Sequence, residues 1–405
     1  MSENALANAG SSRSIYRRFL LPIYVPTLLS SVSLQALLVL VPLYALDKGA
    51  GAPFAAFLIG LRGVGMLLFD MPVGILLARF GDKPVLIAGL VSMTTSTAMF
   101  AMSDSFWVMG AAAVVSGAGF TAWMIGRQSY ITDLSQIGER GRAIAGMAGA
   151  MRIGGFIGPL AGAMMVKEFG FAPAFFALTI SVGCAVLMVA ACTRNVRPNR
   201  DLGNNHLSRI KGIIKAHSRT MMTAGFASLA LQLLRSGRII LIPLFGHFMG
   251  LSIADIGLII SLAAVIDALL FHPVGMVMDR YGRKWMSVPC LVLSAVSLAA
   301  MPLTQGFYSL LAAAMLAGFA NGLGTGSLLT LGSDLAPPDS RSEFFGIWRF
   351  IGDLGHAGGP LMIGALIKLA TLGAAATATV GIGLAGAAVM YWLVDETLRR
   401  DKMPE

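Results

Sequence analysis

The sequence predicts an all-α integral membrane protein with twelve transmembrane helices in two pseudo-symmetric six-helix bundles. Three observations predict this fold class. First, 56% of the 405 residues are hydrophobic and only 12% are charged, whereas soluble domains carry about 25% charged residues. Second, apolar stretches long enough to cross a bilayer recur along the whole chain. Third, the second half of the chain repeats residues of the first half at a constant offset of 201 positions.

Each apolar stretch is expected to form a helix, because a helix satisfies its backbone hydrogen bonds without water. The first stretch follows Arg13, Arg17 and Arg18, as the apolar part of a secretory signal would. It is too long for a signal and lacks a cleavage site of small residues, so we expect it to be retained as a span. The twelve expected spans cover residues 19–46, 54–78, 84–102, 106–130, 142–166, 172–192, 220–249, 255–278, 286–303, 307–332, 343–369 and 372–394.

The internal repeat divides these spans into two sets of six. The offset pairs Arg18 with Arg219 and Pro42 with Pro243, and it keeps one register over most of the chain. We therefore expect two bundles of like fold that rock about a site between them. The expected parts are a cytoplasmic amino end at 1–18, a bundle at 19–192, a cytoplasmic basic linker at 193–219, a second bundle at 220–394 and a cytoplasmic carboxyl end at 395–405.

The net charge of +10 orients the chain and does not indicate a nucleic acid partner. Most Lys and Arg residues lie at the two ends or in the even-numbered connections, and the exceptions in the opposite connections are Lys48, Lys167 and Lys368. The positive-inside rule then places both termini in the cytoplasm. We expect a multi-pass protein of the cell (inner) membrane, in contact with the lipid bilayer.

Enzyme chemistry is not indicated. Cys184, Cys192 and Cys290 lie inside spans without paired spacing, so neither a disulfide framework nor a metal site is expected. The chain has no phosphate-binding loop for ATP and no pairing of a nucleophile with a base. We expect no catalytic residues and no cofactor, and the energy for any transport must come from a gradient.

Two similar strings follow the second and eighth spans. "PVGMVMDRYGRKW" at 273–285 places four charges around a glycine, and "PVGILLARFGDKP" at 72–84 retains part of the pattern. The first copy has Ala78 at the acidic position and Asp82 at a basic one. Together with the twelve spans, these strings resemble the major facilitator superfamily, whose signature at both places reads G-x-x-x-D-R-x-G-R-K.

The resemblance implies the major facilitator fold with a gate on its cytoplasmic side. In that family the acidic residue ends its helix against the positive end of a helix from the other bundle, and the arginines pair with carboxylates that end the fourth and tenth spans. Because Ala78 lacks a carboxylate, we expect the second copy, with Asp279, to contribute more of the interaction energy that holds the two bundles together. The alternative is that the charges only anchor and orient a short loop. The candidate gate residues are Gly74, Arg79, Gly81, Asp133, Gly275, Asp279, Arg280, Gly282, Arg283, Lys284 and Asp334.

A second family pattern, G-x-x-x-G-P-x-x-G, occurs in the fifth span as Gly154, Gly158, Pro159 and Gly162. Glycines at every fourth position let another helix approach closely, and the proline permits a bend. In the family this pattern accompanies export in exchange for protons, whereas ordinary helix packing is the alternative. One departure is Ala113, which stands where such antiporters usually carry an arginine. A proton relay through that arginine is therefore not available.

Ionisable residues inside apolar spans are costly unless they are paired or hydrated, so each is a candidate for function. Arg235 and Arg238 are three positions apart on one helix face. Asp267 in the next span is their natural partner, and a purely structural ion pair is the alternative. The candidates for substrate binding or proton coupling are Arg62, Arg152, Arg235, Arg238, Asp267, Asp353 and His356, together with the polar Gln35 of the first span.

Asp353 shares a helix face with His356 and Arg349. A carboxyl group beside an imidazole could exchange protons near physiological pH, as a proton-coupled carrier requires. Alternatively, Asp353 only neutralises Arg349 or Arg152. Arg127, near the end of the fourth span, is expected at the inner interface, where it would help gating or contact lipid phosphates.

These features predict a secondary active transporter that exports a small amphipathic compound or metabolite in exchange for protons by alternating access. The small excess of arginine over aspartate inside the spans favours a neutral, zwitterionic or anionic substrate over a simple cation. A proton-coupled importer or facilitator of a small metabolite, an anionic one included, is the alternative. A non-transporting sensor or scaffold would not need to keep charges inside the membrane. We expect the protein to act as a monomer, with a small molecule and protons as its partners.

Overall fold

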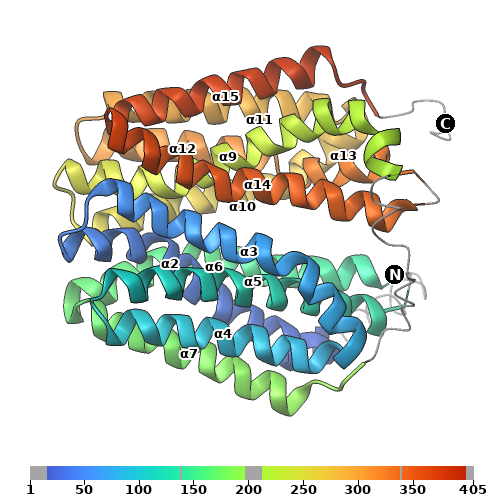
Figure 1. Cartoon of the computed structure of the whole chain (residues 1–405), viewed down its shortest axis with the longest axis horizontal. Helices are drawn as coiled ribbons and strands as arrows, with labels where there is room; N and C mark the ends of the chain where they lie inside the picture. Colours follow the sequence, from blue (N-terminus) through green and yellow to red (C-terminus); the bar gives the residue numbers. More distant parts are fainter. Residues whose placement is uncertain (1–15, 137–138, 197–211, 338–339, 398–405) are drawn as a thin grey trace, which may run out of the picture. The chain divides into compact units, whose positions relative to one another are not determined.

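The computed structural model describes residues 16–136, 139–196, 212–337 and 340–397, which form helices and connections without a β-strand. The first described helix, Tyr16–Asp47, contains a π-helical segment, η1 (Leu20–Tyr24), and a short 3₁₀ turn, η2 (Met301–Leu303), occurs later in the chain. The helices are labelled in Figure 1: α2 (Val25–Asp47), α3 (Ala52–Phe80), α4 (Asp82–Met102), α5 (Phe106–Leu134), α6 (Arg140–Phe169), α7 (Phe171–Cys192), α9 (Ser218–Phe248), α10 (Ile253–Tyr281), α11 (Lys284–Ala300), α12 (Phe307–Leu323), α13 (Ser327–Leu335), α14 (Arg341–Leu369) and α15 (Leu372–Trp392).

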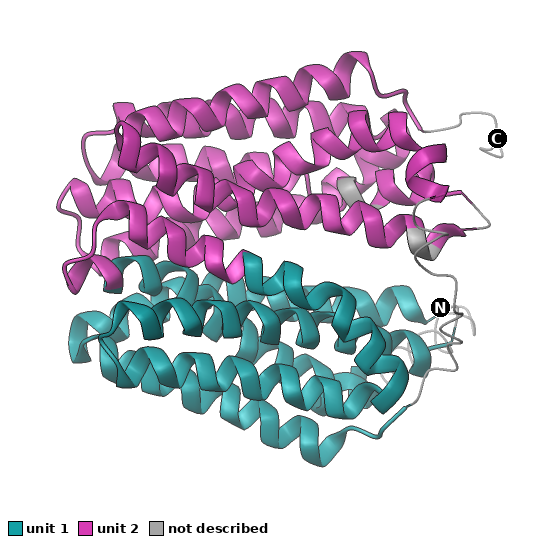
Figure 2. Ribbon diagram, viewed as in Figure 1, with its two compact units in different colours: residues 1–44, 64–202 teal, residues 45–63, 203–405 magenta. Residues whose placement is uncertain are grey.

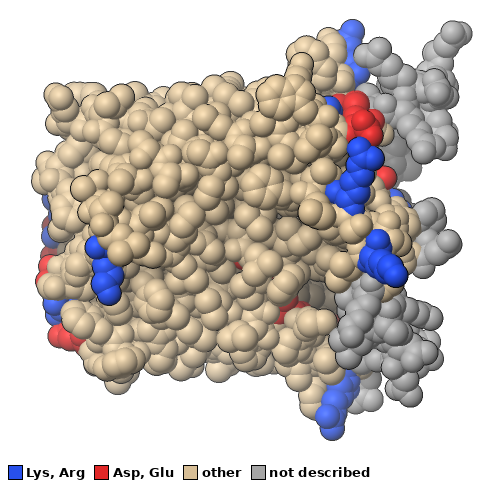
Figure 3. All heavy atoms as spheres, turned by 45° about the horizontal axis from the view of Figure 1, so that its top comes forward, with Lys and Arg blue, Asp and Glu red and all other residues tan. Residues whose placement is uncertain are grey.

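The structure confirms the all-α membrane fold class. Within the described residues, eleven helices are long and apolar enough to cross a membrane, and α12 is a shorter apolar helix. Large apolar side chains such as Ile180, Leu187 and Leu269 are exposed along the helices, as lipid-facing side chains are. On the face shown in Figure 3, most charged side chains gather toward the helix ends, and other residues cover the helix middles.

The expectation of one continuous tenth span, residues 307–332, is wrong. The span breaks between α12 and α13, and Gly326 adopts a left-handed φ of +79°. Glycine takes up this conformation without a steric penalty, and it also weakens a continuous helix. The string "GLGTGS" at 322–327 therefore ends one helix and begins another inside an apolar segment.

The chain forms two compact units, coloured separately in Figure 2. Unit 1 contains Met1–Tyr44 and Val64–Leu202, and unit 2 contains Ala45–Gly63 and Gly203–Glu405. The boundary falls inside α3, so the beginning of that helix belongs to unit 2. The bundles at 19–192 and 220–394, which were inferred from the repeat, remain a prediction.

The beginning of α3 packs tightly on α14 within unit 2. A Cβ atom added at Gly63 would lie 2.5 Å from the Cα atom of Ala357, and one added at Gly364 would lie 2.9 Å from the carbonyl oxygen of Pro53. Neither position leaves room for a side chain. Glycine at these positions brings the backbone of residues 52–63 close to that of α14.

Unit 1 is built on an apolar core that includes Phe19, Leu86, Leu90 and Trp123. Helices α4 and α5 cross in close contact, because a Cβ atom added at Gly119 would lie 2.7 Å from the carbonyl oxygen of Gly89. Such close crossings are typical of helix packing in membranes, where small residues replace the hydrophobic driving force available in water.

The glycine pattern of α6 faces α2 inside unit 1. Added Cβ atoms would lie 2.5 Å from Ser31 Cβ at Gly154, 2.5 Å from the carbonyl oxygen of Val32 at Gly158 and 2.7 Å from the Ala36 Cβ atom at Gly162. Three consecutive turns of α6 therefore touch α2 without intervening side chains. Pro159 lies inside α6. The association of this pattern with proton exchange remains a prediction.

Candidate functional site

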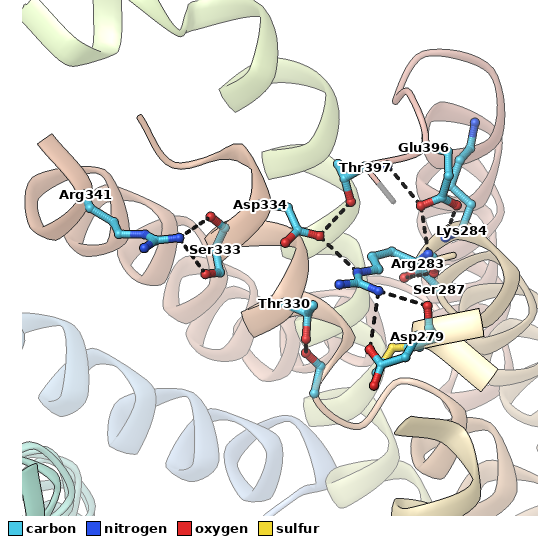
Figure 4. Close-up of polar contacts among 12 residues, drawn as sticks. Asp279, Arg283, Lys284, Ser287, Thr330, Ser333, Asp334, Arg341, Glu396 and Thr397 are labelled. Carbon is cyan, nitrogen blue, oxygen red and sulfur yellow. Dashed lines mark hydrogen bonds and ion pairs between the residues drawn. The ribbon is translucent and has the colours of Figure 1, made fainter. Parts of the chain in front are cut away.

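Arg283 is the centre of the charged loop that follows α10 (Figure 4). Its Nε lies 2.9 Å from Asp334 Oδ2, and one Nη lies 3.5 Å from Asp279 Oδ1. The same Nη donates to the carbonyl oxygen of Met278 at 2.9 Å. The Arg283 and Asp334 side chains are 12% and 26% exposed, whereas that of Asp279 is 79% exposed. The loop arginine is thus paired with the carboxylate that ends the tenth span, and Asp279 is open to solvent.

Glu396 is part of the same network, although it is not among the predicted gate residues. Its carboxylate accepts hydrogen bonds from the backbone N–H groups of Arg283 at 2.8 Å and Lys284 at 3.0 Å. A carboxylate at the start of a helix accepts hydrogen bonds from N–H groups that have no partner within the helix, and the positive end of the helix dipole stabilises its charge. Thr397 donates to Asp334 at 2.8 Å. The carboxyl end of the described chain is therefore tied to the loop after α10 (Figure 4).

The first copy of the loop repeats this geometry with different chemistry. Lys83 Nζ donates to the carbonyl oxygen of Ala190 at 2.6 Å, and Lys284 Nζ donates to that of Tyr391 at 2.7 Å. Asn195 stands at the position equivalent to Glu396 and accepts from the backbone N–H of Lys83 at 3.3 Å. The offset of 201 positions relates Asn195 to Glu396 and Lys83 to Lys284. It could therefore have pointed to Asn195 and Glu396 as the residues that accept these backbone hydrogen bonds.

The other candidate gate residues take part less directly. Gly81 and Gly282 have φ values of +84° and +111°, which favour glycine in these tight turns. The exposed Arg79 and Arg280 lie over the rings of the residues that follow them, Phe80 and Tyr281, at 5.3 and 5.4 Å. Asp133 accepts a hydrogen bond from Ser129 at 3.4 Å. Added Cβ atoms at Gly74 and Gly275 would meet nothing within 4 Å.

A polar cluster lies inside unit 2 around the break in the tenth span. Asp267 of α10 accepts from the Asn321 amide nitrogen at 2.6 Å and from Thr325 Oγ1 at 3.4 Å. Arg238 of α9 donates to the carbonyl oxygen of Ala317 at 3.2 Å and interacts electrostatically with Asp267. Asp267 therefore binds the broken span directly in addition to balancing an arginine.

Arg235 lies on the same face of α9 and contacts the break itself. One Nη donates to Gln232 Oε1 and the other to the carbonyl oxygen of Gly324, both at 3.0 Å. Gly324 is the residue that caps the carboxyl end of α12, where the helix dipole is negative and favours a cation. Arg235 Nε is enclosed and has no acceptor among the residues that the structure describes.

A second part of the cluster joins α14 to the beginning of α3. Asp353 is 9% exposed, and its Oδ2 lies 3.3 Å from Arg349 Nε. Arg62, in the part of α3 that belongs to unit 2, is also buried and interacts electrostatically with Asp353. His356 interacts electrostatically with Arg62, Asp353 and Arg235. The structure thus brings together most of the predicted intramembrane candidates within one unit.

Gln35 and Arg152 belong to unit 1, whereas the cluster belongs to unit 2. A Cβ atom added at Gly155 of α6 would lie 3.2 Å from Gln35 Nε2, so Gln35 of α2 borders the glycine-packed crossing. Arg152 lies in α6, two residues before Gly154, and is partly buried. The roles of Gln35 and Arg152 in substrate or proton binding remain predictions.

The expected contact of Arg127 with lipid phosphates is wrong. Its side chain is only 1% exposed, with the guanidinium 5.7 Å from the Trp123 ring centroid and an Nη 3.0 Å from Met151 Sδ. Sequence position indicated the depth of Arg127 along its helix but not the face on which it lies. Arg127 points into unit 1, where a cation against an aromatic ring is stabilised.

Arginines and aspartates within the spans and beside a broken helix, in a multi-pass helical membrane protein, are features typical of secondary transporters. The family model of the Major Facilitator Superfamily matches residues 23–250 and 224–404. The chain belongs to this family and is a transporter, not an enzyme.

Two relatives are multidrug resistance proteins. The chain is 25% identical over 265 residues to multidrug resistance protein 2 of Bacillus subtilis (strain 168), a match that covers 63% of this chain and 65% of that protein. It is 22% identical over 370 residues to multidrug resistance protein MdtH of Klebsiella pneumoniae (strain 342), which covers 87% of this chain and 88% of the relative. The chain thus spans a little under two thirds of the length of the first relative and most of the second.

Solved structures share the fold at low sequence identity. A mutant form of the nucleoside transporter NupG superposes with a TM-score of 0.79 and 12% identity, covering 93% of this chain and all (100%) of that one. A D-xylose-proton symporter gives a TM-score of 0.74 and 14% identity over 93% of this chain and 97% of that one. At these identities the likeness concerns the fold alone.

Proposed function

We propose that this transporter exports a small amphipathic compound or metabolite in exchange for protons, by alternating access of a site between its two bundles. It would act as a monomer in the inner membrane with both termini in the cytoplasm, as the distribution of basic residues favours. The multidrug resistance relatives support export, as does the close packing of the α6 glycine pattern on α2.

The observation that carries the proposal is the buried carboxylate of Asp353. It lies 3.3 Å from Arg349 and interacts electrostatically with Arg62. A carboxyl group between arginines can be ionised or protonated, and only the ionised form balances the positive charge of the arginines. Binding a proton removes the negative charge that compensates the arginines, so the proton changes the relative stability of the arrangements open to α3 and α14. Asp267 offers a second such group beside the break in the tenth span.

Proton-coupled import is the second candidate, and the same cluster provides the observation that favours it. If Asp353 is protonated, the positive charge of Arg62 and Arg349 is left for an acidic substrate to balance. Proton and substrate would then bind together, and a downhill proton gradient would drive import. Export and import therefore differ in whether proton and substrate exclude or assist each other.

The proposal is tested with the purified full chain in liposomes that carry an imposed pH gradient. Export by antiport predicts that a proton gradient drives a transported compound in the opposite direction to the protons. Movement of both in the same direction would establish the importer instead. The compounds to test are those found in a susceptibility and metabolite-export screen of a deletion strain. If the protein moves neither protons nor any of these compounds, both the export and the import proposals are contradicted, and a role as a sensor or scaffold remains.

A further inference from the structure

We infer that the transported compound is an organic acid, and that Arg235 binds its carboxylate. The inference rests on the proposed transport of a small molecule and names the chemical class of that molecule. It depends on the charges inside unit 2, on the contacts of Arg235 and on the position of Arg235 at the break in the tenth span.

The interior of unit 2 carries an excess of positive charge. Away from the helix ends, its described spans contain Arg62, Arg235, Arg238 and Arg349 against the acidic Asp267 and Asp353. The neighbouring histidines can be neutral, so they need not add to this excess. Uncompensated charge at this depth is costly, and an anionic ligand would reduce the cost.

Arg235 is the member of this set whose contacts leave its charge to be balanced. Among the described residues its acceptors are two neutral oxygens, Gln232 Oε1 and the carbonyl oxygen of Gly324. Its Nε is enclosed without an acceptor. By contrast, Asp353 is paired with Arg349, and Asp267 acts on Arg238. A carboxylate forms shorter and stronger bonds with a guanidinium than neutral oxygens do, so it can take the place of either acceptor.

The surroundings of Arg235 suit the exchange of one acceptor for another. Arg235 and Gln232 are partly exposed, so neither side chain is fully enclosed by the protein. The Gln232 amide accepts from Arg235 through its oxygen and carries N–H donors for a carboxylate oxygen. Gly324 ends α12, and a Cβ atom added there would lie 2.9 Å from an Arg235 Nη. A ligand that draws the guanidinium away therefore acts directly on the end of the broken helix.

The test is equilibrium binding to the purified full chain in nanodiscs, without a gradient. Benzoate, 2-naphthoate and octanoate are compared with their amides and with benzylamine and octylamine, by calorimetry and by the shift in Tm. Inorganic phosphate and chloride at matched ionic strength separate an organic acid from a free inorganic anion. We expect at least one of these carboxylates to bind and to raise Tm, and its amide, the amines and the inorganic anions to have no comparable effect.

Arg235→Gln should weaken carboxylate binding roughly 10- to 100-fold, as expected for loss of a charged hydrogen-bonding partner. Arg235→Lys keeps the charge without the planar fork and should lose less, which separates ligand binding from a purely structural cap on α12. Lys167→Gln, at the exposed end of α6, is the matched control and should bind like the parent. Size-exclusion profiles verify that each variant is folded.

The inference is contradicted if no carboxylate binds, if the amides or inorganic anions bind as well as the carboxylates, or if folded Arg235→Gln and Arg235→Lys both keep the parent affinity. These outcomes are separate from failure of the proposed function. Binding of carboxylates without proton coupling would uphold the acid site and reject the coupling. Coupled transport of a cation without carboxylate binding would uphold transport and reject the acid site.

Discussion

The carboxylate of Asp267 binds the end of α12 and the break that follows it in the tenth span, because it accepts from Asn321 at 2.6 Å and from Thr325 at 3.4 Å. Asn321 belongs to α12, whereas Thr325 lies in the connection that leads to α13. One side chain of α10 thus holds the glycine-rich break in position. Together with the bond from Arg235 to the Gly324 carbonyl oxygen, this carboxylate stabilises the break.

Loss of that carboxylate should loosen the break, and Cys290 can report it. Cys290 is fully buried and borders Gly324. In a Cys184→Ser, Cys192→Ser background, we expect Asp267→Asn to increase the rate at which maleimide labels Cys290. Loss of a charged hydrogen-bond acceptor costs about 1.5–3 kcal/mol, so Tm should fall as well. Asp255→Asn at the start of α10 is the matched control. Equal Cys290 labelling in the parent and Asp267→Asn would refute this role.

The α6 glycine pattern predicts a strong contrast between two alanine substitutions in one helix. Gly158→Ala places a methyl group 2.5 Å from the carbonyl oxygen of Val32, whereas Gly149→Ala meets nothing within 4 Å. Overpacking costs about 1–3 kcal/mol, so we expect a lower Tm and slower transport for Gly158→Ala only. Thermal unfolding and initial transport rates measure this difference. Similar values for the two variants would show that the close approach to α2 is not required.

The exposed Asp279 gives a test of the proposed gate. If Asp279 stabilises the state closed to the cytoplasm, Asp279→Ala should shift the population toward the inward-open state. Accessibility of cysteines placed along the cytoplasmic halves of the spans measures that shift. Glu168→Ala, in the exposed last turn of α6, is the control for loss of one carboxylate. An unchanged accessibility pattern in Asp279→Ala would favour the alternative that the loop charges only anchor and orient the loop.

The Arg283 contact makes a separate prediction about the second loop. Arg283→Met removes the partner of Asp334 and also the side-chain bond to the Met278 carbonyl oxygen. Because Arg283 is mostly buried, we expect a loss of stability larger than the ~0–1 kcal/mol of an exposed ion pair. Arg280→Met, whose side chain is exposed over Tyr281, is the matched control. Equal Tm values for the two variants would contradict this prediction.

The sequence was sufficient for the fold class because hydropathy alone determines which stretches can lie in lipid. It was insufficient at the tenth span, where the glycines of "GLGTGS" at 322–327 interrupt the helix without changing its apolar composition. Hydropathy could not show the break, but several glycines close together could have indicated it, because glycine tolerates the left-handed conformation and weakens a helix. The placement of residues 52–63 with unit 2 depends on tertiary packing on α14, which the repeat does not encode.

The candidate site was predictable in its residue types, in the pair of Asp353 with Arg349 and in the interaction of Asp267 with Arg238, but not in its other contacts between helices. Charge inside a span was enough to select Asp267 and Asp353. Their partners Asn321 and Arg62 lie far away in sequence, and helical spacing cannot identify contacts between distant helices. Glu396 was missed because it lies outside the loop pattern, although the 201-residue offset relates it to Asn195.

The most direct test of proton coupling through the unit 2 carboxylates compares the parent with Asp353→Asn and Asp267→Asn in liposomes. Substrate exchange without a gradient and substrate accumulation driven by a pH gradient are measured on the same preparations. The account predicts that exchange persists in at least one variant while pH-driven accumulation is lost. Full pH-driven accumulation in both variants would contradict it.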